Sequence, residues 1–126
     1  MIQKVGQIMI YVDDQDECVR FWKDIMGFRV VDDQDNGEGM RWIEMSPRTE
    51  SVTTIVLHNK AFVAKMEPDM NLGTPSLMFF TDNVEQLHEH LSKHDITIGE
   101  IINMPNGPVF NFADFEGNYF AVMERK

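Results

Sequence analysis

Two short stretches of the same design decide the fold of this chain: QIMIYVDD at residues 7–14 and LMFFTDN at residues 77–83. Each begins as a run of strand-forming residues, breaks at a polar pair, and leads directly into a segment with helical spacing of apolar residues. In each copy the last strand starts at a similar distance after the break. The sequence therefore predicts two copies of one unit, and the surface where such copies meet is a natural place for a binding site.

The segment after the first break has the pattern of an amphipathic helix. Cys18, Phe21, Trp22 and Ile25 recur at the spacing that places side chains on one helical face. Gly27 follows, and glycine readily adopts the left-handed conformation that ends many helices. This pattern predicts a helix that packs one apolar stripe against a strand.

Alternation and turn signals outline the other elements. For the first copy we predict strands at residues 28–31, 40–45 and 52–58, with an acidic loop at 32–39. For the second copy we predict a strand at 76–81, a helix at 84–93, strands at 97–102, 109–113 and 118–124, and a turn at 104–108. The order βαβββ thus occurs twice, which predicts an α+β fold in a single domain over residues 1–126. Its modules are about 1–60 and 74–126, and the weakly patterned residues 61–73 are interpreted as a linker.

Composition limits the classes of partner. The 126 residues carry a net charge of −10, which argues against nucleic acid and is typical of a well-solvated globular protein. No apolar run is long enough to cross a membrane, and the N-terminus lacks the basic region of a signal peptide. A lone cysteine forms no internal disulfide and is typical of a reducing compartment. We therefore expect a cytoplasmic protein with no nucleic-acid or membrane partner.

Two motifs carry a resemblance to a known family. FADFEGN at residues 112–118 is similar to the turn F-x-D-P-D-G-N, with Phe115 in place of the proline. YVDD at 11–14, leading to FWKDIMG at 21–27, is similar to V-x-D-x-x-x-S-x-x-F-Y-x-x-x-L-G. Over nearly its whole length the chain resembles the vicinal oxygen chelate superfamily, which includes glyoxalase I, the bleomycin-resistance proteins, the fosfomycin-resistance enzymes and the extradiol dioxygenases. The resemblance implies two βαβββ modules that form a cupped mixed sheet.

The resemblance also locates the family's metal ligands, on the first and last strands of each module. Those positions here are Gln7, Val56, Ser76 and Ala121. Valine and alanine have no donor atom, so we expect no metal at these positions and no cofactor. A weak site shifted to His58, with Gln7 and Glu44, leaves a divalent metal open as an alternative.

Strand alternation from the same positions predicts which side chains line the concave face. Methionine and aromatic side chains recur there and suit a planar or cationic small molecule. The predicted ligand-binding residues are Gln7, Met9, Tyr11, Trp42, Thr54, Val56, His58, Ser76, Met78, Phe80, Phe110, Tyr119 and Ala121. A face filled and closed by these side chains is the alternative interpretation.

Other reactive side chains are interpreted as structural. His88, His90 and His94 form no recognisable zinc pattern, and the spacing places His90 and His94 off the apolar stripe of their helix, on a solvated face. Cys18 falls on an apolar stripe, where a thiol is inert. Ser76 has no histidine base within predicted reach, which argues against a serine nucleophile.

Three functions remain. The first is a metal-independent protein that binds a small molecule and sequesters an antibiotic or toxin, as the resemblance to bleomycin-resistance proteins implies. The second is an enzyme, a glyoxalase-like lyase or related transferase, whose chemistry needs a divalent Lewis acid and a carboxylate base; Glu44 is the candidate base. The third is a closed module that binds another protein. In each case the resemblance implies a homodimer.

Overall fold

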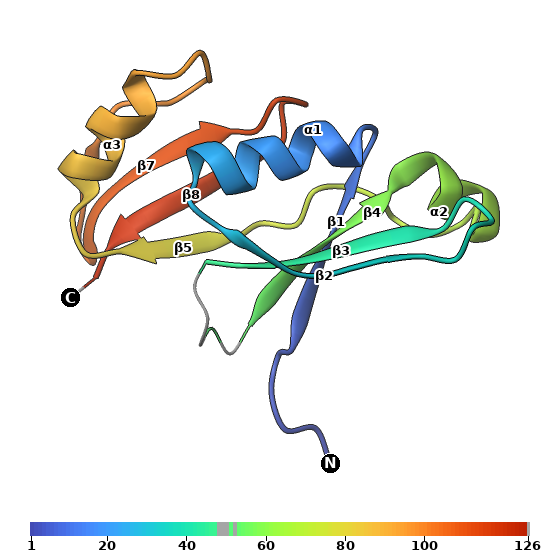
Figure 1. The fold of residues 1–126 in the computed structure, drawn as a ribbon. Helices are drawn as coiled ribbons and strands as arrows, with labels where there is room; N and C mark the ends of the chain where they lie inside the picture. The colour runs from blue at the N-terminus through green and yellow to red at the C-terminus, as the bar shows by residue number, and fades with distance from the viewer. Residues whose placement is uncertain (48–50, 52, 126) are drawn as a thin grey trace. The chain divides into compact units, whose positions relative to one another are not determined.

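The computed structural model describes residues 1–47, 51 and 53–125, and it divides into two compact units, Met1–Pro75 and Ser76–Lys126 (Figure 1). Each unit contains one four-stranded sheet with a helix between its first and second strands, so the fold is α+β with βαβββ topology repeated. Within the described ranges, no helix is long and apolar enough to cross a bilayer.

The first unit contains strands β1 to β4, helices α1 and α2, and a π-helical turn η1. Their bounds are β1 Gln7–Val12, α1 Gln15–Arg20, η1 Phe21–Ile25, β2 Arg29–Asp35, β3 Arg41–Ser46, β4 Thr54–Asn59 and α2 Lys60–Met66. The strand order is β1-β4-β3-β2, and β1 pairs in parallel with β4 while the other pairs are antiparallel. The outer strands of this sheet are therefore β1 and β2.

The predicted first helix is confirmed, with its stripe inward. Asp14 caps α1 with its side chain, and Cys18, Phe21 and Trp22 have no exposed surface. The helix widens into the π-helical turn η1 and stops before Gly27, whose φ of +81° favours a residue without a Cβ. The apolar stripe is thus what binds this helix to the sheet.

One face of the first sheet is the core of the unit. Ile10, Ile43 and Leu57 lie on that face and have no exposed surface, because α1 covers it. Gln15, at the start of α1, donates from Nε2 to the carbonyl oxygens of Arg41 at 2.6 Å and Leu57 at 3.0 Å. These bonds hold the start of α1 against β3 and β4, so the helix covers one face of the sheet.

Strand β2 is longer than predicted. Residues 28–31 were expected as a strand and 32–39 as a loop, but the strand continues to Asp35. The second half of β2 is polar and lies at the outside of the sheet. It therefore lacks the alternation of apolar and polar residues from which a strand is predicted in a sequence. Arg41 on β3 donates to both carboxylate oxygens of Asp33, at 3.0 and 2.8 Å, and these bonds lower the pKa of Asp33. An ion pair, rather than buried apolar side chains, therefore joins β2 to β3 in this part of the hairpin.

Helix α2 begins one residue before the stretch interpreted as a linker and continues into it. Asn59 accepts a hydrogen bond from the backbone N–H of Phe62, which caps the helix start. No residue of α2 is buried. A seven-residue helix without a buried stripe has no periodic apolar signal, which is why the sequence pattern did not indicate it.

The second unit repeats the order of the first. Its elements are β5 Met78–Thr81, α3 Val84–Ser92, β6 Ile102–Met104, β7 Gly107–Ala113 and β8 Tyr119–Glu124. The strand order is β5-β8-β7-β6, with β5 parallel to β8 (Figure 1). The strand predicted at 97–102 is wrong in its extent: a single bridge joins Ile98 to Phe112, and the paired strand begins only at Ile102. Because β6 is short and exposed, its sequence shows no clear alternation of apolar and polar residues from which its bounds could be predicted.

The motif FADFEGN forms the turn between β7 and β8. Asp114, 6% exposed, accepts from the backbone N–H groups of Glu116 and Asn118, each at 2.9 Å. Its other oxygen accepts from Nδ2 of Asn118, also at 2.9 Å, and Gly117 supplies the positive φ that the turn needs. The motif is therefore a structural device that sets the register of β8.

Candidate functional site

The register of the first sheet places the predicted residues of the first unit on one face, opposite α1. Partners in neighbouring strands point to the same side of a sheet, and so do residues two apart on one strand. Three rows result across β1, β4 and β3: Gln7, Thr54 and Ser46; Met9, Val56 and Glu44; Tyr11, His58 and Trp42. Arg29 on β2 extends the first row, because it pairs with Ser46.

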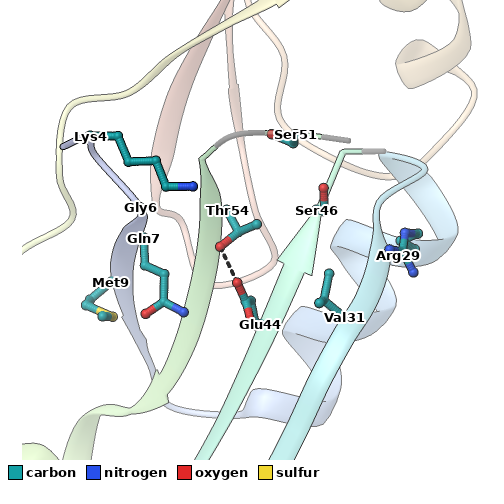
Figure 2. Close-up of a pocket in the computed structure, with 10 residues that line it drawn as sticks. All are labelled: Lys4, Gly6, Gln7, Met9, Arg29, Val31, Glu44, Ser46, Ser51 and Thr54. Atoms are coloured by element: carbon teal, nitrogen blue, oxygen red, sulfur yellow. Dashed lines mark hydrogen bonds between the residues drawn. The ribbon is translucent and has the colours of Figure 1, made fainter. Parts of the chain in front are cut away.

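A groove of about 710 Å³ lies on this face, at the end where β1 begins (Figure 2). It is lined by Lys4, Gly6, Gln7, Met9, Arg29, Val31, Glu44, Ser46, Ser51 and Thr54. Most of these side chains are polar, and Met9 and Val31 provide apolar surface. A volume of this size falls within the range of small-molecule sites.

Glu44 and Thr54 form the polar floor of the groove. The hydroxyl of Thr54 donates to Oε2 of Glu44 at 2.6 Å, and Figure 2 shows the side chains turned toward each other from adjacent strands. Thr54 is buried and Glu44 is partly exposed. Among the described residues, no hydrogen bond occupies Oε1 of Glu44 or the side-chain amide of Gln7.

Two cationic side chains stand at opposite sides of the groove. Lys4 precedes β1 and extends its ammonium over the sheet, while Arg29 begins β2 at the other edge (Figure 2). The ion pairs found among the described residues join other side chains, Arg20 with Glu17 and Arg41 with its two aspartates. Within that part of the chain, Lys4 and Arg29 therefore keep uncompensated positive charge beside the groove.

The third row of this face is aromatic and lies outside the groove lining. Tyr11 stacks on His58 with ring centroids 5.9 Å apart, and Trp42 is the cross-strand partner of His58. The hydroxyl of Tyr11 lies 3.7 Å from the sulfur of Met70, which follows α2. Burial lowers the pKa of His58, so the neutral imidazole is favoured here. The predicted residues of the first unit thus share one face but divide between a groove and an aromatic row.

The donor set does not fit the family's metal site. In the first unit Val56 has no donor atom, and Glu44 already accepts from Thr54. In the second unit Ser76 is a poor ligand and Ala121 is not one. In the described portion of the chain, no three or more His, Cys, Asp or Glu side chains gather as a metal would require.

The second sheet presents an apolar face on the side away from α3. Met78 and Phe80 on β5 and Tyr119 on β8 are 46, 60 and 61% exposed. Met78 pairs with Ala121, and the guanidinium of Arg125 lies 4.9 Å from the ring centroid of Phe80. A hollow of about 300 Å³ on this unit is lined by Ser76, Leu77, Asn111, Tyr119, Phe120 and Ala121.

Phe110 does not belong to that face, so its predicted placement is wrong. It pairs with Val122, one residue out of phase with Ala121, and its side chain packs edge-on against the ring of His88 on α3. Phe110 is 2% exposed because it lies under the helix. His88 also contacts the carbonyl oxygen of Gly99 at 2.9 Å, whereas the ring of His90 on α3 lies 5.1 Å from that of His94, which follows the helix.

Several groove residues were not predicted from the sequence. Lys4 precedes the first strand, so strand alternation says nothing about it, and Ser46 closes a strand predicted to end one residue earlier. Arg29 was within a predicted strand. Alternation along that strand could have assigned its side chain to the same face of the sheet as Glu44. Val31 sits at a bulge in β2, where the pairing shifts between Val30 and Asp32 and simple alternation fails.

Comparison with known proteins identifies the family. The model of the glyoxalase/bleomycin resistance protein/dioxygenase superfamily matches residues 4–122, and the chain belongs to this superfamily. The chain is similar to YetH of Bacillus subtilis (strain 168), with 27% identity over 98% of this chain and 100% of that protein.

Solved structures show the same fold. The chain is similar to TnmS3, an antibiotic-binding protein from Streptomyces sp. CB03234, at 25% identity and a TM-score of 0.83, covering 99% of this chain and 98% of that one. It is also similar to UcmS2, at 25% identity and a TM-score of 0.80, covering 98% of each chain. Glyoxalase I of Leishmania major, at 16% identity, a TM-score of 0.72 and coverage of 98 and 87%, shares the fold.

Proposed function

We propose that this protein binds a small molecule on the face of its first sheet without a metal ion, and that it sequesters an antibiotic or toxin. The observation that carries the proposal is the groove of about 710 Å³, whose lining offers hydrogen-bonding groups and apolar surface. Among the residues that the structure describes, the His, Cys, Asp and Glu side chains form no group that could hold a metal. Similarity to an antibiotic-binding protein over nearly the whole chain supports it.

Sequestration needs binding and no bond-breaking step. Gln7, Glu44 and Thr54 would orient the ligand through hydrogen bonds, and Met9 and Val31 would contact its apolar part. The flexible thioether of Met9 adapts to irregular ligand shapes. The exposed apolar residues of the second unit, Met78 and Tyr119 among them, are proposed as a further ligand-contacting surface, and a homodimer is proposed as the assembly.

The test is a binding screen in the presence of a chelator. Planar aromatic antibiotics are added to the protein in EDTA, and a ligand at about 100 times its Kd should raise the free energy of unfolding by about 2.7 kcal/mol. Mass spectrometry of the recovered ligand should show it unchanged, at a saturable stoichiometry. Val31→Trp should weaken binding by filling the groove, whereas Gln86→Trp, which adds the same ring at an exposed position of α3, should not. Turnover that depends on added metal would contradict the proposal.

Glu44 favours a second candidate, a lyase or transferase. Its carboxylate lies in the groove with one oxygen available, as a general base that removes a proton from a bound substrate must. The measurement is turnover of α-keto thiol adducts by the wild type and by Glu44→Gln. Activity that survives this substitution would remove Glu44 as the base.

A further inference from the structure

The charges around the groove point to one class of ligand, and the argument rests on the proposed function. Although the chain carries a net charge of −10, the groove of the first unit has Lys4 and Arg29 at its sides and Glu44 on its floor. We propose that the groove binds an anionic small molecule, whose acid group lies between Lys4 and Arg29 and whose hydrogen-bond donor faces Glu44.

The geometry separates these two features along the strands. Arg29 pairs with Ser46, two residues beyond Glu44 on β3, so the row of Arg29 and the row of Glu44 lie about 7 Å apart. Lys4 reaches toward Thr54 from the opposite edge of the sheet (Figure 2). The fitting ligand carries a carboxylate, sulfonate or phosphonate at one end and a hydroxyl or amine about 7 Å away.

Competing charges lie on the Glu44 side of the groove. Asp32 is the cross-strand partner of Glu44, and its carboxylate accepts from Nε2 of Gln34 at 2.7 Å. Glu44 accepts from a neutral hydroxyl. The acidic groups thus repel an anion from this row and direct it toward Lys4 and Arg29, which fixes the orientation of the ligand.

This inference differs from the sequence-based expectation of a planar or cationic ligand, and a net charge of −10 does not oppose it. Net charge describes the whole surface, whereas a ligand in a groove senses charges within a Debye length of about 8 Å. Lys4 and Arg29 therefore matter more to a bound ligand than the acidic side chains elsewhere on the protein.

A matched pair of fluorescent probes tests the inference. The dye 8-anilinonaphthalene-1-sulfonate carries a sulfonate, and N-phenyl-1-naphthylamine has the same ring system without it. The wild type should bind the sulfonate dye more tightly, and Lys4→Met and Arg29→Met should each weaken that dye about two- to fivefold, as expected for a partly exposed ion pair, without changing the neutral dye. Lys23→Met, at an exposed lysine on η1, is the control and should change neither dye. Glu44→Gln should tighten the sulfonate dye.

The outcomes separate this inference from the proposed function. If Val31→Trp or Met9→Trp weakens both dyes while Lys4→Met and Arg29→Met leave the sulfonate dye unchanged, the groove binds ligands and the anion inference is overturned. If neither tryptophan variant weakens either dye, the groove is not the site, and the proposed function fails with it. Selective loss of the sulfonate dye in both cation variants, reduced by high salt in the wild type, supports the inference.

Discussion

The two sheets share one strand order and one helix position, yet the faces away from their helices differ in chemistry. In the first unit that face offers a carboxylate, an amide and hydroxyl groups around a groove. In the second unit it offers Met78, Phe80 and Tyr119, all exposed. The repeated topology gives both sheets one helix-covered face and one face without that helix, and alternate strand residues determine the chemistry of each face. Two copies of one topology therefore present different surfaces.

The largest expected effect tests whether the helix-covered face of the second sheet is the core. Phe112 has no exposed surface, and Phe112→Ala should lower the free energy of unfolding by about 3–5 kcal/mol because it leaves a cavity. Phe80→Ala, at a 60% exposed position on the opposite face, should cost less than about 1 kcal/mol. Urea denaturation of both variants measures the difference. Equal losses would show that the second face is not free for a ligand.

The second prediction tests how much the hydrogen bonds of Gln15 contribute to holding α1 on its face of the first sheet. Gln15→Ala removes two hydrogen bonds and leaves the carbonyl groups of Arg41 and Leu57 without them, at a cost of about 2 kcal/mol. Gln86→Ala, at an exposed position of α3, should change stability by less than about 0.5 kcal/mol. Thermal unfolding followed by circular dichroism compares them, and a neutral Gln15→Ala would mean that the apolar stripe alone holds the helix.

A smaller effect is expected on the floor of the groove. Thr54→Val keeps the shape of the side chain but removes the donor to Glu44, so stability should fall by about 1 kcal/mol. Thr97→Val, at an exposed threonine of the second unit, is the matched control. Chemical denaturation gives both values. If Thr54→Val is as stable as wild type, the Thr54–Glu44 bond does not order the groove.

The smallest effect is the pH dependence due to His58. Because burial lowers its folded-state pKa below the usual 6.5, the unfolded chain binds a proton first as the pH falls. Stability should therefore be unaffected by His58 above pH 6.5, decline as the pH falls through 6.5 toward the lowered folded-state pKa, and level off below that. Comparing unfolding of the wild type and His58→Gln across this window isolates the contribution, and identical slopes would contradict it.

The sequence predicted those parts of the fold that depend on buried apolar periodicity. The stripe of Cys18, Phe21 and Trp22 located the first helix, and the turn at residues 112–118 located the last hairpin. Helix α2 and the second half of β2 were missed for the same physical reason: neither buries an apolar face.

The candidate site was predicted less completely, because a groove depends on register and on segments outside strands. Alternation brought Gln7, Met9 and Thr54 together, since all three lie on regular strands. It could not place Lys4, which precedes the sheet, or Val31 at its bulge. Phe110 was assigned to the wrong face because a one-residue error in phase moves a strand side chain to the opposite side.

The burial of Cys18 makes the rate of thiol modification a measure of how often helix α1 opens. It is the single cysteine in the sequence and has no exposed surface, so a thiol reagent reaches it only when α1 separates from its sheet. The labelling rate therefore reports how readily α1 opens, whether by local opening or by global unfolding. A ligand that binds only the closed form of that unit would slow the modification, even if its binding changes no spectroscopic signal.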